Sequence, residues 1–338
     1  MSLVSQLCVR PGGLLAAAGF TLLGSPFVAA TPLPAWEPLP PLPVGNGGFV
    51  SAALDDEIVV AGGTTWHGDT KLWLDQIWAY HPRRRTWREA GRLPAAVGYS
   101  VFGQDARALW FAGGSSGAST HRSLWQMTTA AAISRVSPID HGAVIGFGAL
   151  IGSTLYLVGG TDDPTRTDRT TNVCVGIDVG TGETRRLADH PESSVITGAA
   201  AALGDRLYVF GGGGWDAAGR TVVNRASAHV YLPAEDRWEA LPPLPRPARG
   251  LAAVVLDESH ILIAGGFRGP QEGFVADAML FDPTARTYTP TVPLPYAAMV
   301  GLVRSGDWLY CLGGEDRAKH RTDAAFRIRW RDLLPPPK

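Results

Sequence analysis

This chain of 338 residues has little charge and very little lysine. Charged residues make up 18% of it, below the roughly 25% of typical soluble domains. Lysine occurs only as Lys71, Lys319 and Lys338, so almost all basic residues are arginine. The 30 basic and 31 acidic residues nearly cancel, and no basic tract stands out. Because nucleic-acid binding needs a clustered positive surface, we expect no nucleic-acid partner.

Cysteine is also scarce, with Cys8, Cys174 and Cys311 as the only three. The repeat described below separates Cys174 from Cys311, so we expect two buried thiols without a redox role. His and Cys spacings typical of zinc sites are missing, and the acidic residues at 162, 163 and 168 lack EF-hand spacing. We therefore expect no metal and no cofactor.

Long hydrophobic runs are absent, and the apolar segment at 14–23 is too short to span a membrane. It follows Arg10, the only charge in the first thirty residues, and small residues at 28–30 offer a cleavage site. This is the anatomy of a signal peptide. We expect residues 1–30 to be removed and the rest exported to the periplasm or secreted, without stable membrane insertion. A cytoplasmic chain with an apolar leader is the alternative.

Glycine and proline are abundant, with 41 and 26 residues. Such a composition argues against a helical bundle, because these residues interrupt helices. A hydrophobic content of 45% excludes a disordered chain, which would be poor in apolar residues. The composition therefore favours a β-rich globular protein with many turns.

A glycine doublet recurs six times, each time after a short apolar run that is typical of a buried strand. Successive doublets are 51, 46, 52, 54 and 48 residues apart. The doublets begin at Gly62, Gly113, Gly159, Gly211, Gly265 and Gly313. Six units of about 50 residues predict a six-bladed β-propeller, in which each unit is a four-stranded antiparallel sheet.

Aromatic residues keep phase with the doublets. In the first unit Tyr80 is followed seven positions later by Trp87, and six positions after that comes Leu-Pro. The third unit is degenerate, with His190-Pro191 in place of Leu-Pro, and the second is weaker still. The last unit lacks its outer strand, whereas Trp36 begins a matching segment at the other end of the chain. We predict that this N-terminal segment closes the last blade.

The doublet, the following Tyr and the spaced Trp resemble the Kelch repeat. The resemblance covers almost all of residues 31–338 and implies an all-β, six-bladed Kelch propeller forming one domain. Kelch propellers include both enzymes and protein-binding modules, so the fold alone does not decide the function.

The loops after strands two and four share one face of a propeller, and polar loops on a rigid scaffold are the expected place for binding. Aromatic rings can stack on sugars, and arginines and carboxylates can bind hydroxyl and acid groups. Solvated loops with local ion pairs are the alternative. The candidate ligand-binding residues are Trp66, His67, Arg166, Trp215, Asp216, Arg220, Arg249 and Arg268.

The sixth of these loops carries a sharper pattern. Gly314-Glu315 is followed after five residues by Arg321-Thr322-Asp323-Ala324-Ala325-Phe326. The pattern resembles a motif of the bacterial N-acetylneuraminate (sialic acid) mutarotases, which are exported six-bladed Kelch proteins. The resemblance implies catalytic roles for Glu315 and Arg321 in anomerisation. In that family the motif lies in a middle blade, whereas here it lies in the last. A circularly permuted blade order is one explanation, and a chance match between degenerate Kelch repeats is the other.

Two functional hypotheses follow. In the first, the protein is a cofactor-free isomerase of a free acidic sugar such as N-acetylneuraminate, with Glu315 moving the proton and Arg321 binding a carboxylate or stabilising an oxyanion. In the second, it is a non-catalytic module that binds glycan or protein through the same face, and Glu315 and Arg321 only fix a loop. Convergence of further arginines on Glu315 in a concave pocket would favour the enzyme.

Overall fold

The computed structural model describes residues 35–117, 119–130, 132–139, 143–163 and 165–335. The expected leader at residues 1–30 lies outside them and stays a prediction. Helix is limited in this part of the chain to two short 3-10 turns, η1 (Thr167–Arg169) and η2 (Trp330–Leu333). No helix among the described residues is long and apolar enough to cross a membrane.

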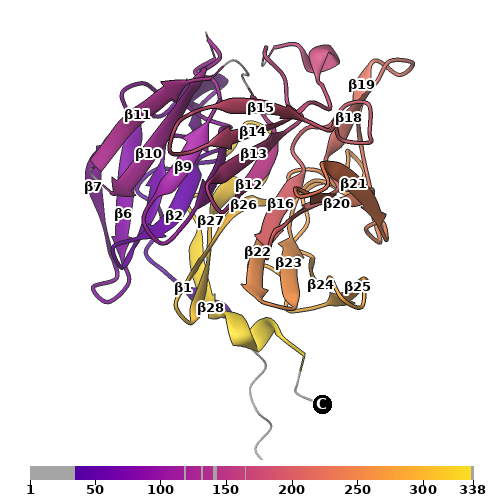
Figure 1. The fold of residues 1–338 in the computed structure, drawn as a ribbon. Coiled ribbons are helices and arrows are strands. Elements are labelled where there is room, and N and C mark those ends of the chain that lie inside the picture. Colours follow the sequence, from indigo (N-terminus) through magenta and orange to yellow (C-terminus); the bar gives the residue numbers. More distant parts are fainter. Residues whose placement is uncertain (1–34, 118, 131, 140–142, 164, 336–338) are drawn as a thin grey trace, which may run out of the picture. The chain divides into compact units, whose positions relative to one another are not determined.

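The strands form six four-stranded antiparallel sheets arranged as the blades of a propeller (Figure 1). In the first five blades the strands follow chain order from the innermost to the outermost. Blades one to three are β2 (Val50–Leu54), β3 (Glu57–Ala61), β6 (Gln76–His81), β7 (Thr86–Arg92); β8 (Val101–Gln104), β9 (Leu109–Ala112), β10 (Ser123–Thr129), β11 (Ala132–Pro138); and β12 (Phe147–Ile151), β13 (Thr154–Val158), β14 (Cys174–Asp178), β15 (Thr184–Leu187).

Blades four and five are β16 (Ala199–Leu203), β17 (Arg206–Phe210), β20 (Ala228–Leu232), β21 (Arg237–Leu241); and β22 (Ala252–Asp257), β23 (His260–Ala264), β24 (Ala278–Asp282), β25 (Thr287–Pro290). Blade six is β26 (Met299–Ser305), β27 (Trp308–Glu315), β28 (Ala325–Arg329) and β1 (Glu37–Pro38). The innermost strands of neighbouring blades contact one another around the whole ring. The predicted six-bladed, all-β fold is therefore confirmed.

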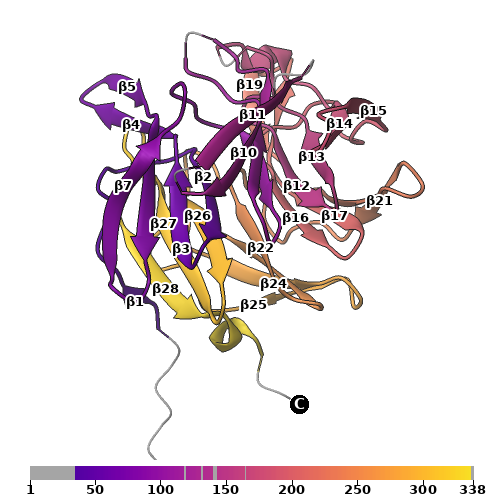
Figure 2. The same cartoon turned by 60° about the vertical axis from the view of Figure 1, so that its left-hand side comes forward.

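Two short ribbons extend this scaffold. They are β4 (Thr64–His67) with β5 (Thr70–Trp73), and β18 (Gly213–Asp216) with β19 (Thr221–Asn224). The first strand of each ribbon begins directly after a glycine doublet, and both ribbons project from the same end of the propeller (Figure 2). They raise the walls around that end, which we call the doublet face.

The N-terminal segment closes the ring as predicted. β1 pairs with β28 in the blade that contains Gly313, with Glu37 opposite Arg327. The two side chains also form an ion pair of 2.9 Å. This pairing covers the edge of β28, which would otherwise expose unpaired backbone groups.

Outer-strand aromatics link four of the blades to the preceding one. In four blades the aromatic side chain donates a hydrogen bond to a backbone carbonyl that follows the outer strand of the neighbour. The pairs are Trp36 to Pro293, Trp87 to Pro40, Trp238 to Ala188 and Tyr288 to Pro242, at 2.7–3.0 Å. Because Trp36 makes the same contact as Trp87 and Trp238, the closing junction is built like the others.

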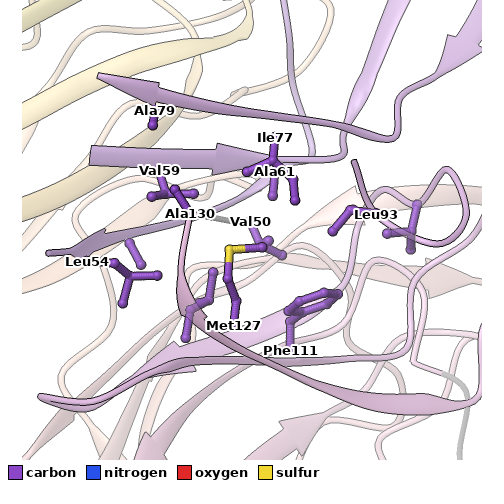
Figure 3. Close-up of a cluster of buried hydrophobic side chains, with 13 residues drawn as sticks. Val50, Leu54, Val59, Ala61, Ile77, Ala79, Leu93, Phe111, Met127 and Ala130 are labelled. Carbon is purple, nitrogen blue, oxygen red and sulfur yellow. The ribbon is translucent and has the colours of Figure 1, made fainter. Parts of the chain in front are cut away.

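The hydrophobic core lies between the blades. Ile77 of blade one packs in one cluster with Phe111 and Met127 of blade two, and all three are nearly inaccessible to water (Figure 3). A strand with neighbours on both faces becomes apolar throughout, as in β9, where every residue is buried. Full burial stabilises each such large side chain by about 1.5–3 kcal/mol.

The glycine doublets fix the segments that cross from blade to blade. In all six, both glycines have φ between 50° and 107°, and the amide of the second donates to a crossing-segment carbonyl at 2.7–3.0 Å. A Cβ on the first glycine would lie less than 3.0 Å from the same oxygen. The accepting carbonyls belong to Val97, Ala143, Val195, Ala248, Ala298 and Asn46. A side chain at the first position would therefore meet both backbone strain and a clash.

Replacing Gly159 with Ala tests this account. Gly152, in the same blade, has a similar φ of 57° but open space around its Cβ position. Gly152→Ala should lower the free energy of unfolding by about 1 kcal/mol, the left-handed penalty alone. Gly159→Ala adds the clash with Val195, so we expect a loss of at least about 3 kcal/mol in urea denaturation. Equal losses in the two variants would contradict the account.

His190 takes the place that leucine holds in the better-conserved units. It is only 3% exposed, and its ring lies 4.7 Å from that of His229 and 4.9 Å from that of Trp238. Its Nδ1 accepts a hydrogen bond from the Glu192 amide. Burial, together with the charge of His229, lowers the pKa of His190 to about 3. The folded protein thus holds His190 neutral.

This predicts acid sensitivity at the junction of blades three and four. The folded-state pKa of His190 lies below the unfolded value of about 6.5. Between these two pKa values the unfolded chain binds more protons than the folded protein, so the folded protein becomes less stable as the pH is lowered. His190→Leu should become more stable relative to the wild type by up to about 1.4 kcal/mol per pH unit below pH 6.5. Urea unfolding at pH 7, 5.5 and 4.5 measures this, and parallel pH dependence would refute it.

Candidate functional site

The innermost strands surround a central cavity of about 790 Å³. Small residues line its middle, among them Gly103, Gly148, Ala199, Ala252 and Gly301. Polar groups line both ends of the cavity, with Glu315 and Arg321 at the doublet face and Gln104 and Arg304 toward the opposite end. A hollow with an apolar middle and a few polar groups is the usual form of a small-molecule site.

Glu315 stands at the mouth because it ends β27, where it pairs with Met299 at the start of the inner strand β26. Its carboxylate Oε2 lies 2.9 Å from Nη1 of Arg321. The Glu315 side chain is 30% exposed and that of Arg321 only 4%. The pair therefore has a buried cationic side and a carboxylate that faces the cavity.

The guanidinium of Arg321 is largely occupied by protein groups. Nη1 also donates to the His320 carbonyl at 2.9 Å, and Nη2 donates to the Tyr99 hydroxyl at 3.1 Å. Nε points to Thr64 Oγ1 at 3.4 Å. A guanidinium has five N–H groups, so little capacity remains for a ligand. This disfavours substrate-carboxylate binding by Arg321 and favours a role in holding Glu315.

The closing segment makes room for these side chains. A Cβ on Gly47 would collide with the Arg321 side chain, and one on Gly48 would collide with the ring of Tyr99. Between the blades, Asn46 accepts the Gly314 amide at its carbonyl, 2.7 Å away, and its side chain donates to the Gly62 carbonyl at 2.8 Å. The strand that closes the ring therefore also shapes the mouth.

Tyr99 is a site residue that sequence reasoning missed. It has a left-handed φ of 62°, at the repeat position held by Gly48 and Gly250 in two other blades. The ammonium of Lys71 lies 4.5 Å from its ring centre. Burial alone would raise the pKa of Tyr99, but the positive charges of Arg321 and Lys71, with hydrogen bonds from Lys71 and Thr64, bring it below its ordinary value. Ile145 and Thr197, also left-handed, hold this position in two further blades, so the phenol of Tyr99 itself was the available signal.

Arg249 is a predicted binding residue whose charge interacts with that of Glu315, although it does not itself line the cavity. It precedes Gly250, which does line the cavity, and its guanidinium lies 4.6 Å from the centre of the Phe267 ring. Burial lowers the pKa of Arg249, and the nearby charge of Glu315 opposes this effect. Its Nη1 donates to Asn224 at 2.7 Å. It forms no ion pair with any residue that the structure describes.

The isomerase hypothesis expects further arginines to converge on Glu315. Arg268 and Arg220 do not. Arg268 is tied to Asp277 at 2.7 Å within its own loop. Ribbon β18–β19 carries Trp215 and Arg220 outward from the ring. With Arg166, from the loop before η1, they line a separate hollow of about 530 Å³. We call this hollow the peripheral pocket.

The remaining predicted residues have local roles. Asp216 accepts the amides of Ala218 and Gly219 and so caps the turn of its ribbon. Trp66 and His67 lie in β4, where His67 is exposed and the Trp66 indole N–H is buried without a partner among the described groups. Cys174 and Cys311 are buried free thiols. In the described part of the chain, no three His, Cys, Asp or Glu side chains are grouped to hold a metal ion.

Comparisons with known proteins agree with this fold. Residues 46–94 match the Kelch motif. The chain is 28% identical to spermatocyte protein spe-26 of Caenorhabditis elegans, over 51% of this chain and 30% of that protein. It is 26% identical to Kelch-like protein 35 of Mus musculus, over 81% and 44%. It is 33% identical to beta-scruin of Limulus polyphemus, over 33% and 12%.

The matches span less than half the length of each of these relatives. None of the three is named as a sugar mutarotase, so that resemblance rests on the segment from Glu315 to Phe326 alone. The fold, the motif and the relatives together identify the chain as a six-bladed β-propeller that carries a Kelch motif and is similar to Kelch-like proteins.

Proposed function

We propose that this propeller interconverts the anomers of a free acidic sugar, such as N-acetylneuraminate, at the doublet-face mouth of its channel. The observation that carries the proposal is the Glu315 carboxylate, which lines the cavity while buried Arg321 holds one of its oxygens. No described group donates a hydrogen bond to the other oxygen, Oε1, which is left for a ligand.

The reaction suits such a group. Mutarotation opens a cyclic hemiketal or hemiacetal and closes it again on the other face, and it needs only proton transfers. A carboxylate beside the anomeric hydroxyl can take up and return that proton, an effect typically worth about 10²–10⁴-fold. Arg321 keeps the carboxylate in place during this exchange, as a positioning residue.

Arg249 is the group best suited to the acid function of the sugar. It is half-buried and lacks an ion pair with described residues, and Asn224 is the one hydrogen-bond partner of its guanidinium among them. Arginine can bind a carboxylate through two parallel hydrogen bonds. Because Arg249 and Glu315 interact without touching, a ligand between them would be held at both ends. The predicted leader would bring the protein to sugars outside the cytoplasm.

A second candidate function is non-catalytic binding of glycan or protein through the doublet face. The peripheral pocket favours it, because Trp215 offers a flat ring beside the cations Arg166 and Arg220. In this pocket Arg166 is already paired with Asp168 at 2.5 Å. An exposed pair of this kind contributes only about 0–1 kcal/mol and can be exchanged for a ligand.

Anomer exchange measured by NMR on freshly dissolved single anomers separates the two functions. The wild type should accelerate exchange of at least one acidic sugar, and Glu315→Gln should lose about 100-fold or more of that rate. Glu272→Gln, which removes a surface carboxylate paired with Arg246, should keep the full rate. No acceleration by the wild type for any sugar would contradict the isomerase and favour the binding module.

A further inference from the structure

We infer that Tyr99 is the second proton-transfer group of this site, donating its hydroxyl proton to the ring oxygen of the sugar while Glu315 takes the proton of the anomeric hydroxyl. The inference rests on the proposed function and extends it, because ring opening needs an acid as well as a base. Tyr99 and Glu315 line the same cavity.

Arg321 fixes the two groups relative to each other. Its Nη1 contacts the Glu315 carboxylate at 2.9 Å, and its Nη2 contacts the Tyr99 hydroxyl at 3.1 Å. The guanidinium is planar and rigid, so it holds its two partners side by side. A carboxylate and a phenol are thereby presented together at one mouth of the channel.

The hydroxyl proton of Tyr99 has one acceptor among the described groups, Thr64 Oγ1 in a long contact of 3.3 Å, and a ligand oxygen can replace it. Arg321 can only donate, so the Tyr99 oxygen is the acceptor in that bond. The hydroxyl of Thr64 donates to the Gly47 carbonyl at 3.0 Å, and its contact with Tyr99 is long, at 3.3 Å. Tyr99 therefore keeps a proton without a strong acceptor among the described groups, and a ligand oxygen can receive it.

Nearby positive charge stabilises the phenolate that such a transfer leaves. Lys71 lies over the ring of Tyr99 and that of Trp73, at 4.5 and 4.9 Å from the ring centres. Arg321 approaches from blade six, and Lys71 approaches from ribbon β4–β5. Their charges outweigh the burial of Tyr99 and lower its pKa. The carboxylate of Glu315 lies on the far side of Arg321, and the guanidinium of Arg249 is near Glu315.

The backbone holds Tyr99 in an unusual conformation. Its left-handed φ is 62°, its amide donates to the Gly48 carbonyl at 2.7 Å, and its ring packs edge-on against Trp73 at 5.7 Å. A left-handed residue with a large side chain costs about 1–3 kcal/mol and persists where the surroundings impose it, often at functional sites. Ile145 and Thr197 are left-handed at the corresponding positions, so the repeat imposes this backbone, and at Tyr99 it carries the phenol that Arg321 contacts.

The proposed step balances. Glu315 accepts the proton of the anomeric hydroxyl, and the carbon–oxygen double bond forms as the bond to the ring oxygen breaks. The ring oxygen takes the proton of Tyr99, which leaves an open-chain sugar, a neutral Glu315 and a phenolate. After rotation about the adjacent bond, the same transfers in reverse close the ring on the other face and restore both side chains.

Tyr99→Phe tests the inference. It should lower the rate of anomer exchange by about 100-fold or more, while the affinity for the sugar, measured by calorimetry, changes less than about threefold. Tyr288→Phe is the matched control, because it removes a buried tyrosine hydroxyl that bonds Pro242 between blades. That variant should lose stability and keep its exchange rate.

A pH profile separates proton transfer from a merely structural role. An acid must be protonated to act, so the rate should fall at pH values above the pKa of Tyr99. Lys71→Met removes a charge that lowers this pKa, so the falling limb should move to higher pH while the phenol remains. An unmoved limb would contradict the assignment.

The outcomes distinguish the two proposals. A wild type that accelerates no sugar overturns the proposed function and the proton transfer with it. A wild type that exchanges anomers, with Tyr99→Phe at the same rate, overturns the role of Tyr99 and leaves Glu315 standing. Loss of exchange in Tyr99→Phe with retained binding, together with the shifted limb in Lys71→Met, supports the pair.

Discussion

The hydrogen bond from the second glycine of each doublet to a crossing-segment carbonyl organises this molecule. It is repeated six times, and it fixes where the chain leaves one blade and enters the next. Positive φ at both glycines turns the backbone toward that carbonyl, and the approach leaves no space for a Cβ on the first. The loops of the doublet face therefore start from a rigid base, although their own sequences vary freely.

In the sixth repeat this bond also joins the chain ends to the site. The acceptor is Asn46, just after the strand that closes the ring, and its side chain reaches Gly62 of the first doublet. The next two residues, Gly47 and Gly48, lie against Arg321 and Tyr99. Ring closure and the channel mouth are thus one structure, so damage to the closing strand would disturb the site as well as the stability.

Periodic and local features could be predicted from the sequence. The doublets, the outer aromatics and the matching segment at Trp36 repeat at fixed spacing, and the structure confirms the blades and the closure drawn from them. Which side chains face the channel could not be predicted in this way. Arg220 and Trp215 lie outside the channel because ribbon β18–β19 carries them outward. The repeat pattern of the sequence does not predict that ribbon.

Tyr99 could not be predicted from the sequence because its position depends on the tertiary structure. Its place depends on a left-handed backbone and on a bond to Arg321, which is 222 residues away in sequence. Such a contact arises only when the first and last blades meet. The sequence pointed to Glu315 because its motif is local, whereas the groups around it come from three blades.

A crystal structure with N-acetylneuraminate, or with another sugar whose exchange the protein accelerates, is the most direct measurement. The account predicts the sugar at the doublet-face mouth of the channel. Its anomeric hydroxyl should lie within hydrogen-bond distance of Glu315 Oε1, its ring oxygen near the Tyr99 hydroxyl and its carboxylate on Arg249. A sugar bound only in the peripheral pocket beside Trp215, with the channel mouth empty, would contradict it.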